Sequence, residues 1–399
     1  MNVSIKKGKA SGKITAPPSK SYAHRLLIAS ALAGSGAVVE NVAQSEDILA
    51  TLNCLKCLGI EYKIDGSRVK FLSSNKLRVS GVLNCNESGS TLRFMIPIAL
   101  TTGEKVTLKG TEKLISRGIG IYKDVLKGVT ISQTATEITL NGKLQSGVYE
   151  IKGDVSSQFI TGLMYALPLI DGESLIKILP PVESRSYIEM SVYALSLFGV
   201  KIDKISENEY KVYGSQNYLP RKEKVEGDWS NSAFLHALNE VGGNVVVDGL
   251  NPDSLQGDKA YLEAFTELNK GFNEIDLGNC PDLAPVLFAI ASVKHGAKFL
   301  NTKRLKIKES DRALVMAKEL KKFGVKCEVE ENFAVVYKGE INAPSVALFG
   351  HNDHRIVMAL SVLLTLTGGK IEGANAVKKS YPNFFEDISS LGIKVDYEY

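Results

Sequence analysis

The sequence lacks several features that would place it in a common class of protein. Only five of its 399 residues are cysteine, five are histidine and one is tryptophan. An odd number of scattered cysteines predicts reduced thiols, and Cys54 and Cys57, at helical spacing, predict core packing rather than redox chemistry. No apolar run is long enough to cross a bilayer, and no apolar segment follows the basic N-terminus. A cytoplasmic protein without a membrane partner is expected.

The signatures of nucleotide and metal chemistry are also missing. The sequence contains no G-x-x-x-x-G-K-[ST], no G-x-G-x-x-G after a predicted strand, no G-x-S-x-G and no H-E-x-x-H. His351 and His354 flank Asn352-Asp353 without a carboxylate cluster of metal type. The net charge is only +4, and no basic block predicts a nucleic-acid partner. No cofactor and no metal are therefore expected.

One pattern recurs along the chain: a short polar opening, then about a dozen mostly apolar residues typical of a buried helix, then Gly. The six copies are PSKSYAHRLLIASALAGSG from Pro18, NESGSTLRFMIPIALTTG from Asn86, GDVSSQFITGLMYALPLIDG from Gly153, GDWSNSAFLHALNEVGG from Gly227, GNCPDLAPVLFAIASVKHG from Gly278 and GHNDHRIVMALSVLLTLTGG from Gly350. A second, more amphipathic helical segment follows each copy, and several of these end in Gly before an alternating strand, as in Leu58-Gly59-Ile60-Glu61-Tyr62.

The repeat predicts an α/β fold of two domains, each with three βαβαββ units. The apolar helices would lie inside and the sheets outside, as in an inside-out α/β barrel. We expect a first domain over 14–225 and a second over 1–13 plus 226–399. The hinge is expected near 13–14 and within 213–227, with the active site in a cleft between the domains.

The polar openings predict an anion site, because unpaired N–H groups and the macrodipole favour anions at helix N-termini. Ser and Gly there are also ordinary N-caps. Cations oppose the dipole unless an anionic ligand offsets them, which makes Lys20, Arg25 and Arg355 informative. The openings carry Lys20, Ser21, Arg25, Ser88, Gly89, Ser90, Arg93, Ser156, Ser157, Gln158, Asp282, Asp353 and Arg355.

Ten short motifs then resemble the 5-enolpyruvylshikimate-3-phosphate synthase family, in that family's order and over the whole chain. They are PPSKSYAHR (17–25), NESGSTLR (86–93), SRGIG (116–120), SSQF (156–159), ESRSY (183–187), EGDWS (226–230), PDLAP (281–285), KESDR (308–312), NDHR (352–355) and KSYPNFF (379–385). The fold that the resemblance implies, two domains of three βαβαββ units, agrees with the repeats.

The resemblance implies transfer of the enolpyruvyl group of phosphoenolpyruvate to the 5-hydroxyl of shikimate 3-phosphate, with release of phosphate, in aromatic amino-acid biosynthesis. Carried over by motif, Glu309 is the proton donor and Asp282 the proton acceptor. The residues implied to hold shikimate 3-phosphate are Lys20, Ser21, Arg25, Ser156, Ser157, Gln158, Ser184, Asp282 and Lys308. Those implied to hold phosphoenolpyruvate are Lys20, Gly89, Arg117, Gln158, Arg312, Arg355 and Lys379. A monomer that binds only small-molecule substrates is expected.

Some positions depart from the family pattern: Glu87 stands where many members have Asn, Ser90 where many have Thr, and Arg304 where some have Asn. The herbicide glyphosate competes with phosphoenolpyruvate in this family, so these departures bear on sensitivity near Gly89. Arg93 and Tyr187 could either contact a ligand or brace the wall of the cleft.

Three alternatives stay open at this point. A UDP-N-acetylglucosamine enolpyruvyl transferase typically has a reactive Cys in a loop of its first domain, and 103–128 contains none. A relative of RNA 3′-phosphate cyclase would need ATP and a nucleophilic His, and the chain has no basic stripe for RNA. A non-catalytic anion-binding module would not require Asp282 and Glu309 beside the cations.

The run Lys308-Glu309-Ser310-Asp311-Arg312 generates the first prediction. A charge run at a helix start is usually a solvated face, whereas the resemblance makes Glu309 the acid that protonates carbon. Replacing Glu309 by Gln is expected to lower turnover much more than substrate binding, because the amide cannot donate the proton. Steady-state kinetics with a binding measurement checks this, and near-normal turnover in the variant would remove Glu309 from the mechanism.

Overall fold

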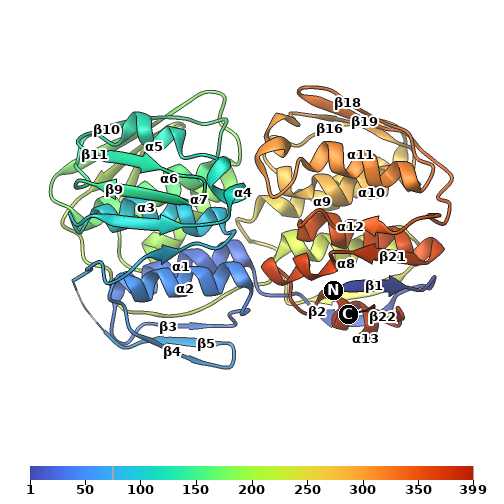
Figure 1. Ribbon diagram of the computed structural model, residues 1–399, viewed down its shortest axis with the longest axis horizontal. Helices are drawn as coiled ribbons and strands as arrows, with labels where there is room; N and C mark the ends of the chain where they lie inside the picture. The colour runs from blue at the N-terminus through green and yellow to red at the C-terminus, as the bar shows by residue number, and fades with distance from the viewer. Residues whose placement is uncertain (74–75, 399) are drawn as a thin grey trace. The chain divides into compact units, whose positions relative to one another are not determined.

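The computed structural model describes residues 1–73 and 76–398, which form two compact units (Figure 1). We call Lys20–Glu226 the inserted unit, and Met1–Ser19 with Gly227–Tyr399 the terminal unit. The chain thus passes from one unit to the other at 19–20 and at 226–227. β2 (Ser11–Thr15) pairs with a strand of the terminal unit, which explains why the first passage comes after 13–14.

Three apolar helices form the centre of the inserted unit, and nearly every side chain on them is buried. They are α1 (Lys20–Ala33), α3 (Gly89–Leu100) and α6 (Ser157–Ala166). The remaining helices, more polar on one face, are α2 (Glu46–Cys57), α4 (Glu112–Ser116), α5 (Gly120–Val125) and α7 (Arg185–Leu197), with the short η1 (Leu167–Leu169) after α6. Cys54 is fully buried on α2, so the prediction of core packing for this thiol is confirmed.

The terminal unit repeats this plan. Its buried helices are α8 (Trp229–Glu240), α10 (Ala284–Val293) and α12 (His354–Thr367). Its amphipathic helices are α9 (Tyr261–Lys270), α11 (Arg312–Lys322) and α13 (Phe384–Ser390). Short 3-10 turns are η2 (Gly257–Ala260), η3 (Pro281–Leu283), η4 (Lys303–Ile307) and η5 (Ala374–Lys379).

The sheets of the inserted unit share one topology, in which a parallel pair is extended by two antiparallel strands. The first has the order β14 (Lys222–Lys224), β3 (Val38–Glu40), β5 (Arg68–Phe71), β4 (Tyr62–Asp65). The second is β6 (Leu83–Asn84), β7 (Val106–Lys109), β9 (Glu137–Asn141), β8 (Thr130–Gln133). The third is β10 (Val148–Lys152), β11 (Glu173–Leu179), β13 (Glu209–Tyr213), β12 (Ile202–Ser206).

In the terminal unit the same order recurs in β16 (Asn273–Asp276), β17 (Ala297–Leu300), β19 (Phe333–Val336), β18 (Cys327–Val329). A second sheet has the order β20 (Leu348–Phe349), β21 (Gly369–Glu372), β1 (Asn2–Ile5), β22 (Val395–Glu398). A two-stranded parallel sheet joins β2 to β15 (Asn244–Asp248). Because β1 pairs with β22, the two ends of the chain lie side by side (Figure 1).

The strand order confirms the predicted α/β fold with one correction. Three of the six repeats, the second, third and fifth, supply the full βαβαββ set from their own segment. The fourth copy ends after α9, and the next strand along the chain, β16, opens the fifth copy. The loop between α9 and β16 holds only 271–272, too short for two further strands. Two repeats also take a strand from elsewhere: β14 completes the first sheet, and β1 completes the last.

The glycines predicted as helix ends do have the left-handed backbone that this role requires. Gly59 after α2 has φ +85° and Gly324 after α11 has φ +88°. Their N–H groups donate to Lys56 and Lys321, satisfying carbonyls that the helix leaves open. None of the helices of the described residues is long and apolar enough to span a membrane.

The close packing of α3 against α6 generates a stability prediction. A Cβ on Gly162 would overlap the Tyr122 hydroxyl and lie 2.6 Å from the Arg93 carbonyl oxygen. Gly162→Ala is therefore expected to destabilise the protein by about 1–3 kcal/mol through overpacking. Gly120→Ala is a matched control, because nothing lies within 4 Å of the added atom and no positive φ is required. Urea unfolding compares the two, and equal stability would contradict a close α3–α6 contact.

Candidate functional site

Four inner helices begin after a polar residue whose side chain accepts a hydrogen bond from the first turn. Ser88 and Ser156 cap α3 and α6 by accepting hydrogen bonds from the N–H groups of Thr91 and Gln158. In the terminal unit, Asp228 and Asp353 cap α8 and α12 in the same way. The N-caps expected from sequence are therefore present at four of the six helix starts.

Arg25 on α1 is a buried cation without a carboxylate partner. Its side chain is 3% exposed and its Nε donates to Ser191 Oγ at 2.9 Å. The other donors reach the carbonyls of Ser21 and Tyr187 and the hydroxyl of Thr161. Within the described residues no carboxylate lies at ion-pair distance from it, and burial lowers the pKa of Arg25. An unbalanced buried charge favours an anionic ligand nearby.

Lys20, at the first position of α1, is paired with a carboxylate that the sequence reasoning missed. Its Nζ lies 2.8 Å from Oδ2 of Asp47 on α2, and both side chains are largely buried. Asp47 stands in the first turn of α2, so its sequence context resembles an ordinary helix-start acid. The pair fixes the ammonium group beside the start of α1.

The start of α3 is crowded by two guanidinium groups. A Cβ on Gly89 would lie 3.2 Å from Arg117 Nη2 and 3.3 Å from Arg93 Nη1, so a side chain there would push both guanidinium groups back slightly. Arg93 also donates to Gln158 Oε1 at 2.5 Å, and Gln158 donates to Ser90 Oγ at 2.9 Å. Predicted site residues of α3 and α6 are thus joined by hydrogen bonds.

Arg93 and Tyr187, whose roles the sequence did not decide, both contact neighbouring site residues. Arg93 is buried, and its guanidinium lies 5.0 Å from the centre of the Phe159 ring while it holds Gln158. Tyr187 accepts a hydrogen bond from Arg25 through its carbonyl, and its ring centre is 5.8 Å from that guanidinium. Ser184, which begins the same helix, is buried in a left-handed conformation.

In the terminal unit, Arg312 gathers three carboxylates around one guanidinium. Its Nε donates to Asp353 Oδ2 at 2.9 Å, Nη1 to Asp282 Oδ1 at 2.6 Å and Nη2 to Glu309 Oε2 at 2.7 Å. Arg312 is 1% exposed; burial alone would lower its pKa, but the three carboxylates together raise it. Asp353 is fully buried, whereas the side chains of Asp282 and Glu309 are 22% and 18% exposed. Only the latter two present oxygen atoms to solvent or to a ligand.

Asp282 receives further cations from two neighbours. Lys308 Nζ lies 3.1 Å from its Oδ1, and Arg355 Nη2 lies 3.3 Å from its Oδ2. Burial opposes its ionisation, but Arg355, Lys308 and Arg312 hold the pKa of Asp282 well below its usual range. The group is therefore ionised at neutral pH.

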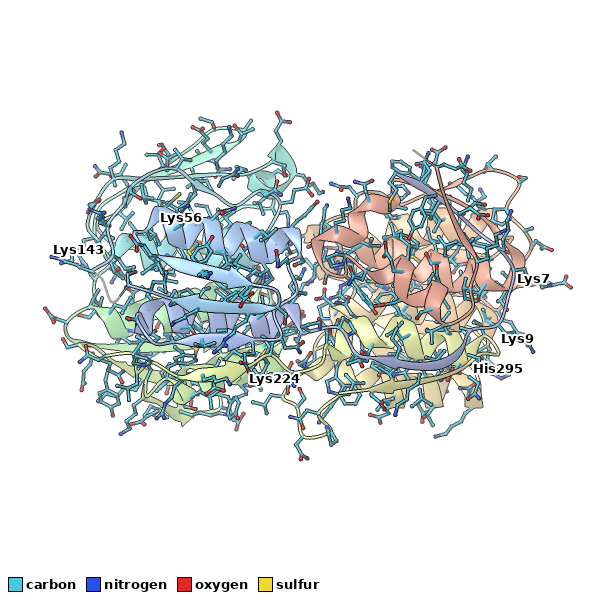
Figure 2. All side chains as sticks on the ribbon, turned by 90° about the horizontal axis from the view of Figure 1, so that it is seen from below. Lys7, Lys9, Lys56, Lys143, Lys224 and His295 are labelled. Carbon is cyan, nitrogen blue, oxygen red and sulfur yellow. The ribbon has the colours of Figure 1, made fainter. Side chains whose placement is uncertain are left out.

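Arg355 and Lys379 also take fixed positions. Arg355 donates to the hydroxyl of Ser230, a residue of the EGDWS motif that was given no role from sequence, at 2.7 Å. Lys379 Nζ donates to the carbonyl of Asn352 at 2.6 Å. Both side chains are about 5% exposed. Five lysines and one histidine are exposed instead and are labelled in Figure 2: Lys7, Lys9, Lys56, Lys143, Lys224 and His295.

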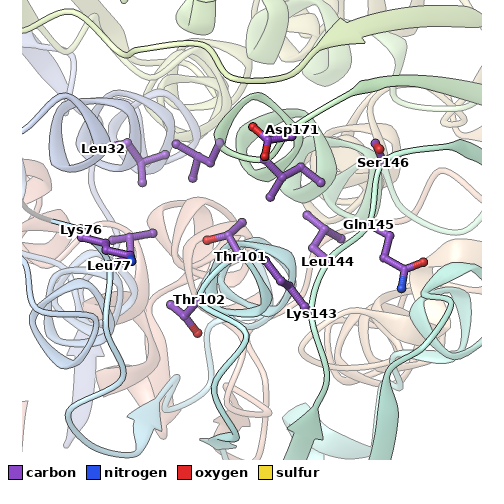
Figure 3. A pocket seen from close by; sticks show the side chains of 12 residues that line it. Leu32, Lys76, Leu77, Thr101, Thr102, Lys143, Leu144, Gln145, Ser146 and Asp171 are labelled. Carbon is purple, nitrogen blue, oxygen red and sulfur yellow. The ribbon is translucent and has the colours of Figure 1, made fainter.

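A separate cavity of about 610 Å³ lies in the inserted unit, but at the wrong helix ends for an anion (Figure 3). It is lined by residues that end or follow the inner helices, such as Leu32, Thr101 and Leu169. Helix C-termini carry partial negative charge, so phosphate groups are favoured at the opposite ends. Throughout 1–73 and 76–398, no group of three or more His, Cys, Asp or Glu side chains is arranged to hold a metal ion.

Comparison of structures assigns the fold. An EPSP synthase from Acinetobacter baumannii superimposes with a TM-score of 0.81 at 21% identity, covering 99% of this chain and 100% of that one. A second structure of EPSP synthase from the same organism also gives a TM-score of 0.81 at 20% identity, covering 100% of both chains. The protein therefore has the two-domain α/β fold of an EPSP synthase.

Comparison of sequences assigns the family. The EPSP synthase (3-phosphoshikimate 1-carboxyvinyltransferase) family model matches residues 5–388. A 3-phosphoshikimate 1-carboxyvinyltransferase of Clostridium kluyveri is 39% identical, covering 99% of this chain and 98% of that protein. Its counterpart in Clostridium novyi is 37% identical with the same coverage. The chain belongs to the EPSP synthase family, which confirms the resemblance found in the sequence motifs.

Lys308 generates a prediction about charge at this site. Burial lowers the pKa of Lys308 to about 8, although Asp282 opposes the shift. The ammonium group is therefore charged below this pH, and its attraction for anions is lost as the pH rises through about 8. An NMR titration of the lysine side chains, with Lys308→Arg used for assignment, should show one midpoint well below that of a free lysine. A midpoint near about 10.4, the value of a free lysine, would contradict this environment.

Proposed function

We propose that this protein transfers the enolpyruvyl group of phosphoenolpyruvate to the 5-hydroxyl of shikimate 3-phosphate, releasing inorganic phosphate. The reaction belongs to the shikimate route of aromatic amino-acid biosynthesis. Family membership over nearly the whole chain supports the overall reaction. The observation that carries the chemistry is that Asp282 and Glu309 are held by one guanidinium, at 2.6 and 2.7 Å, and are the exposed acids of that cluster.

The proposed mechanism is an addition followed by an elimination. Glu309 donates a proton to the methylene carbon of phosphoenolpyruvate while the 5-hydroxyl oxygen attacks its C2 carbon, and Asp282 accepts the hydroxyl proton. In the tetrahedral intermediate, the bond between C2 and the phosphate oxygen then breaks. Glu309, left as a carboxylate by the addition, takes a proton back from the methyl group, which restores the double bond. Phosphate leaves with the electron pair of the broken C–O bond and takes up the proton held by Asp282. Because the C–O bond breaks rather than the P–O bond, no magnesium clamp on the phosphate is required.

The proposed binding groups fall into two sets. Shikimate 3-phosphate is held by Lys20, Ser21, Arg25, Ser156, Ser157, Gln158, Ser184, Asp282 and Lys308. Phosphoenolpyruvate is held by Lys20, Gly89, Arg117, Gln158, Arg312, Arg355 and Lys379. Support for the first set comes from Arg25, a buried cation without a counterion. Support for the second comes from the guanidinium groups that converge on Gly89.

Each set takes residues from both units, and the chain passes between the units at 19–20 and 226–227. The proposal also makes the protein a cytoplasmic monomer that acts on small molecules and not on nucleic acid.

Phosphate release tests this function directly. The protein is expected to release phosphate from phosphoenolpyruvate when shikimate 3-phosphate is present, and to release none with UDP-N-acetylglucosamine in its place. A colorimetric phosphate assay with each acceptor distinguishes the two enolpyruvyl transferases, and product mass identifies the transferred group. Binding of both substrates without turnover would instead indicate an anion-binding module, and activity with the sugar nucleotide alone would replace the proposed acceptor.

A further inference from the structure

Glu319 on α11 is a fully buried carboxylate that the proposed mechanism does not use. Its Oε1 lies 2.8 Å from His351 Nε2, and its Oε2 accepts hydrogen bonds from the Phe349 N–H at 3.0 Å and from Lys322 Nζ at 2.7 Å. Lys322 also donates to the carbonyl of Ala347. All these partners except Lys322 belong to the segment 347–351, so one carboxylate fixes the chain just before α12.

The segment that Glu319 holds has an unusual backbone. His351 has φ +49° and Asn352 has φ +54°, so two consecutive residues with side chains adopt the left-handed conformation. Each such residue costs of the order of 1 kcal/mol or more and persists only where surrounding contacts impose it. The carbonyl of Asn352 accepts the hydrogen bond from Lys379, and Asp353 follows as the cap of α12. The strained turn thus sits between Glu319 and the proposed ligand groups.

α11 holds this segment at both ends. At its start, Arg312 Nε and Ser310 Oγ donate to Asp353 Oδ2, at 2.9 and 3.0 Å. Two helical turns later, Glu319 holds Phe349 and His351. Arg312 and Glu319 are seven residues apart and so lie on the same face of α11. This one face therefore contacts the chain both before and after the turn at 351–352.

We propose that Glu319 is a positioning residue for phosphoenolpyruvate binding, acting through His351 and the Phe349 N–H on the turn that places Arg355 and Lys379. This inference rests on the proposed function for the identity of the ligand. The carboxylate does not touch the ligand. It keeps the left-handed turn in place, so that the Asn352 carbonyl meets Lys379 and the Asp353 cap orients the start of α12.

Glu319→Gln is the central test, because it removes the charge and one strong acceptor while keeping the shape. Hydrogen bonds to charged groups are stronger than those between neutral groups, so the variant is expected to hold the turn less firmly. The expected result is a KM for phosphoenolpyruvate raised about tenfold, with the KM for shikimate 3-phosphate and kcat nearly unchanged. Glu328→Gln is the matched control, since Glu328 is an exposed carboxylate of β18 paired with Lys326; both KM values should stay as in the wild type.

A second variant separates the hydrogen bond from the backbone strain. His351→Gly tolerates a positive φ but removes the imidazole that meets Glu319. It should also raise the KM for phosphoenolpyruvate, and combining it with Glu319→Gln should add little, because both variants remove the same contact. If Glu319→Gln fails to fold, the KM of His351→Gly for phosphoenolpyruvate tests the positioning role instead. If the two changes raise the KM for phosphoenolpyruvate additively, Glu319 does not act through His351.

Amide exchange gives a readout independent of turnover. In the wild type, the Phe349 N–H is bound to a buried acceptor and should be protected, and Glu319→Gln should reduce this protection while leaving α10 unaffected. Unchanged protection, or an equal rise in both KM values, would overturn the positioning role. If the wild type releases no phosphate, the proposed function is wrong. The exchange experiment would then still test whether Glu319 holds the turn.

Discussion

The terminal unit depends on the neutralisation of one buried guanidinium. Arg312 is almost without solvent contact, and a charge in that position is tolerated only with paired and hydrogen-bonded counterions. Its partners stand at three separate helix starts: Asp282 in the turn before α10, Glu309 before α11 and Asp353 at the cap of α12. The same ion pairs that stabilise the cluster therefore fix the relative positions of three helix N-termini, and with them the two acids that remain accessible.

The inserted unit has the opposite arrangement of charges. Lys20 has a nearby carboxylate, whereas the groups that contact Arg25 among the described residues are hydroxyl, carbonyl and aromatic. Gly89 adds a point where two guanidinium groups approach one backbone. One unit thus holds acids saturated with cations, whereas the other holds a buried cation that lacks an acid. Substrates with several negative charges fit the second environment, and proton transfer fits the first.

The inner helices could be predicted from the sequence because buried helices consist mostly of apolar residues. The inner helices are apolar on all sides, and α10 contains no charged residue at all, so their repeat was visible without any structure. The capping glycines carried an equally local signal. The ion pair of Asp47 with Lys20 and the buried Glu319 carried none, because each acid occupies an ordinary helical position and only tertiary packing brings its partner near. The missing strands of the fourth copy could not be predicted, because its inner helix has the same pattern as those of the other copies.

The pairing of β1 also constrains the order in which the protein can fold during synthesis. β1 is made long before its two neighbours, β21 and β22. The inserted unit is contiguous and has all its strands once residue 226 has been made. On a ribosome, where domains generally fold as units as they emerge, it can form first. β1 becomes a central strand of its sheet and stays without its neighbours until β21 and β22 have been made.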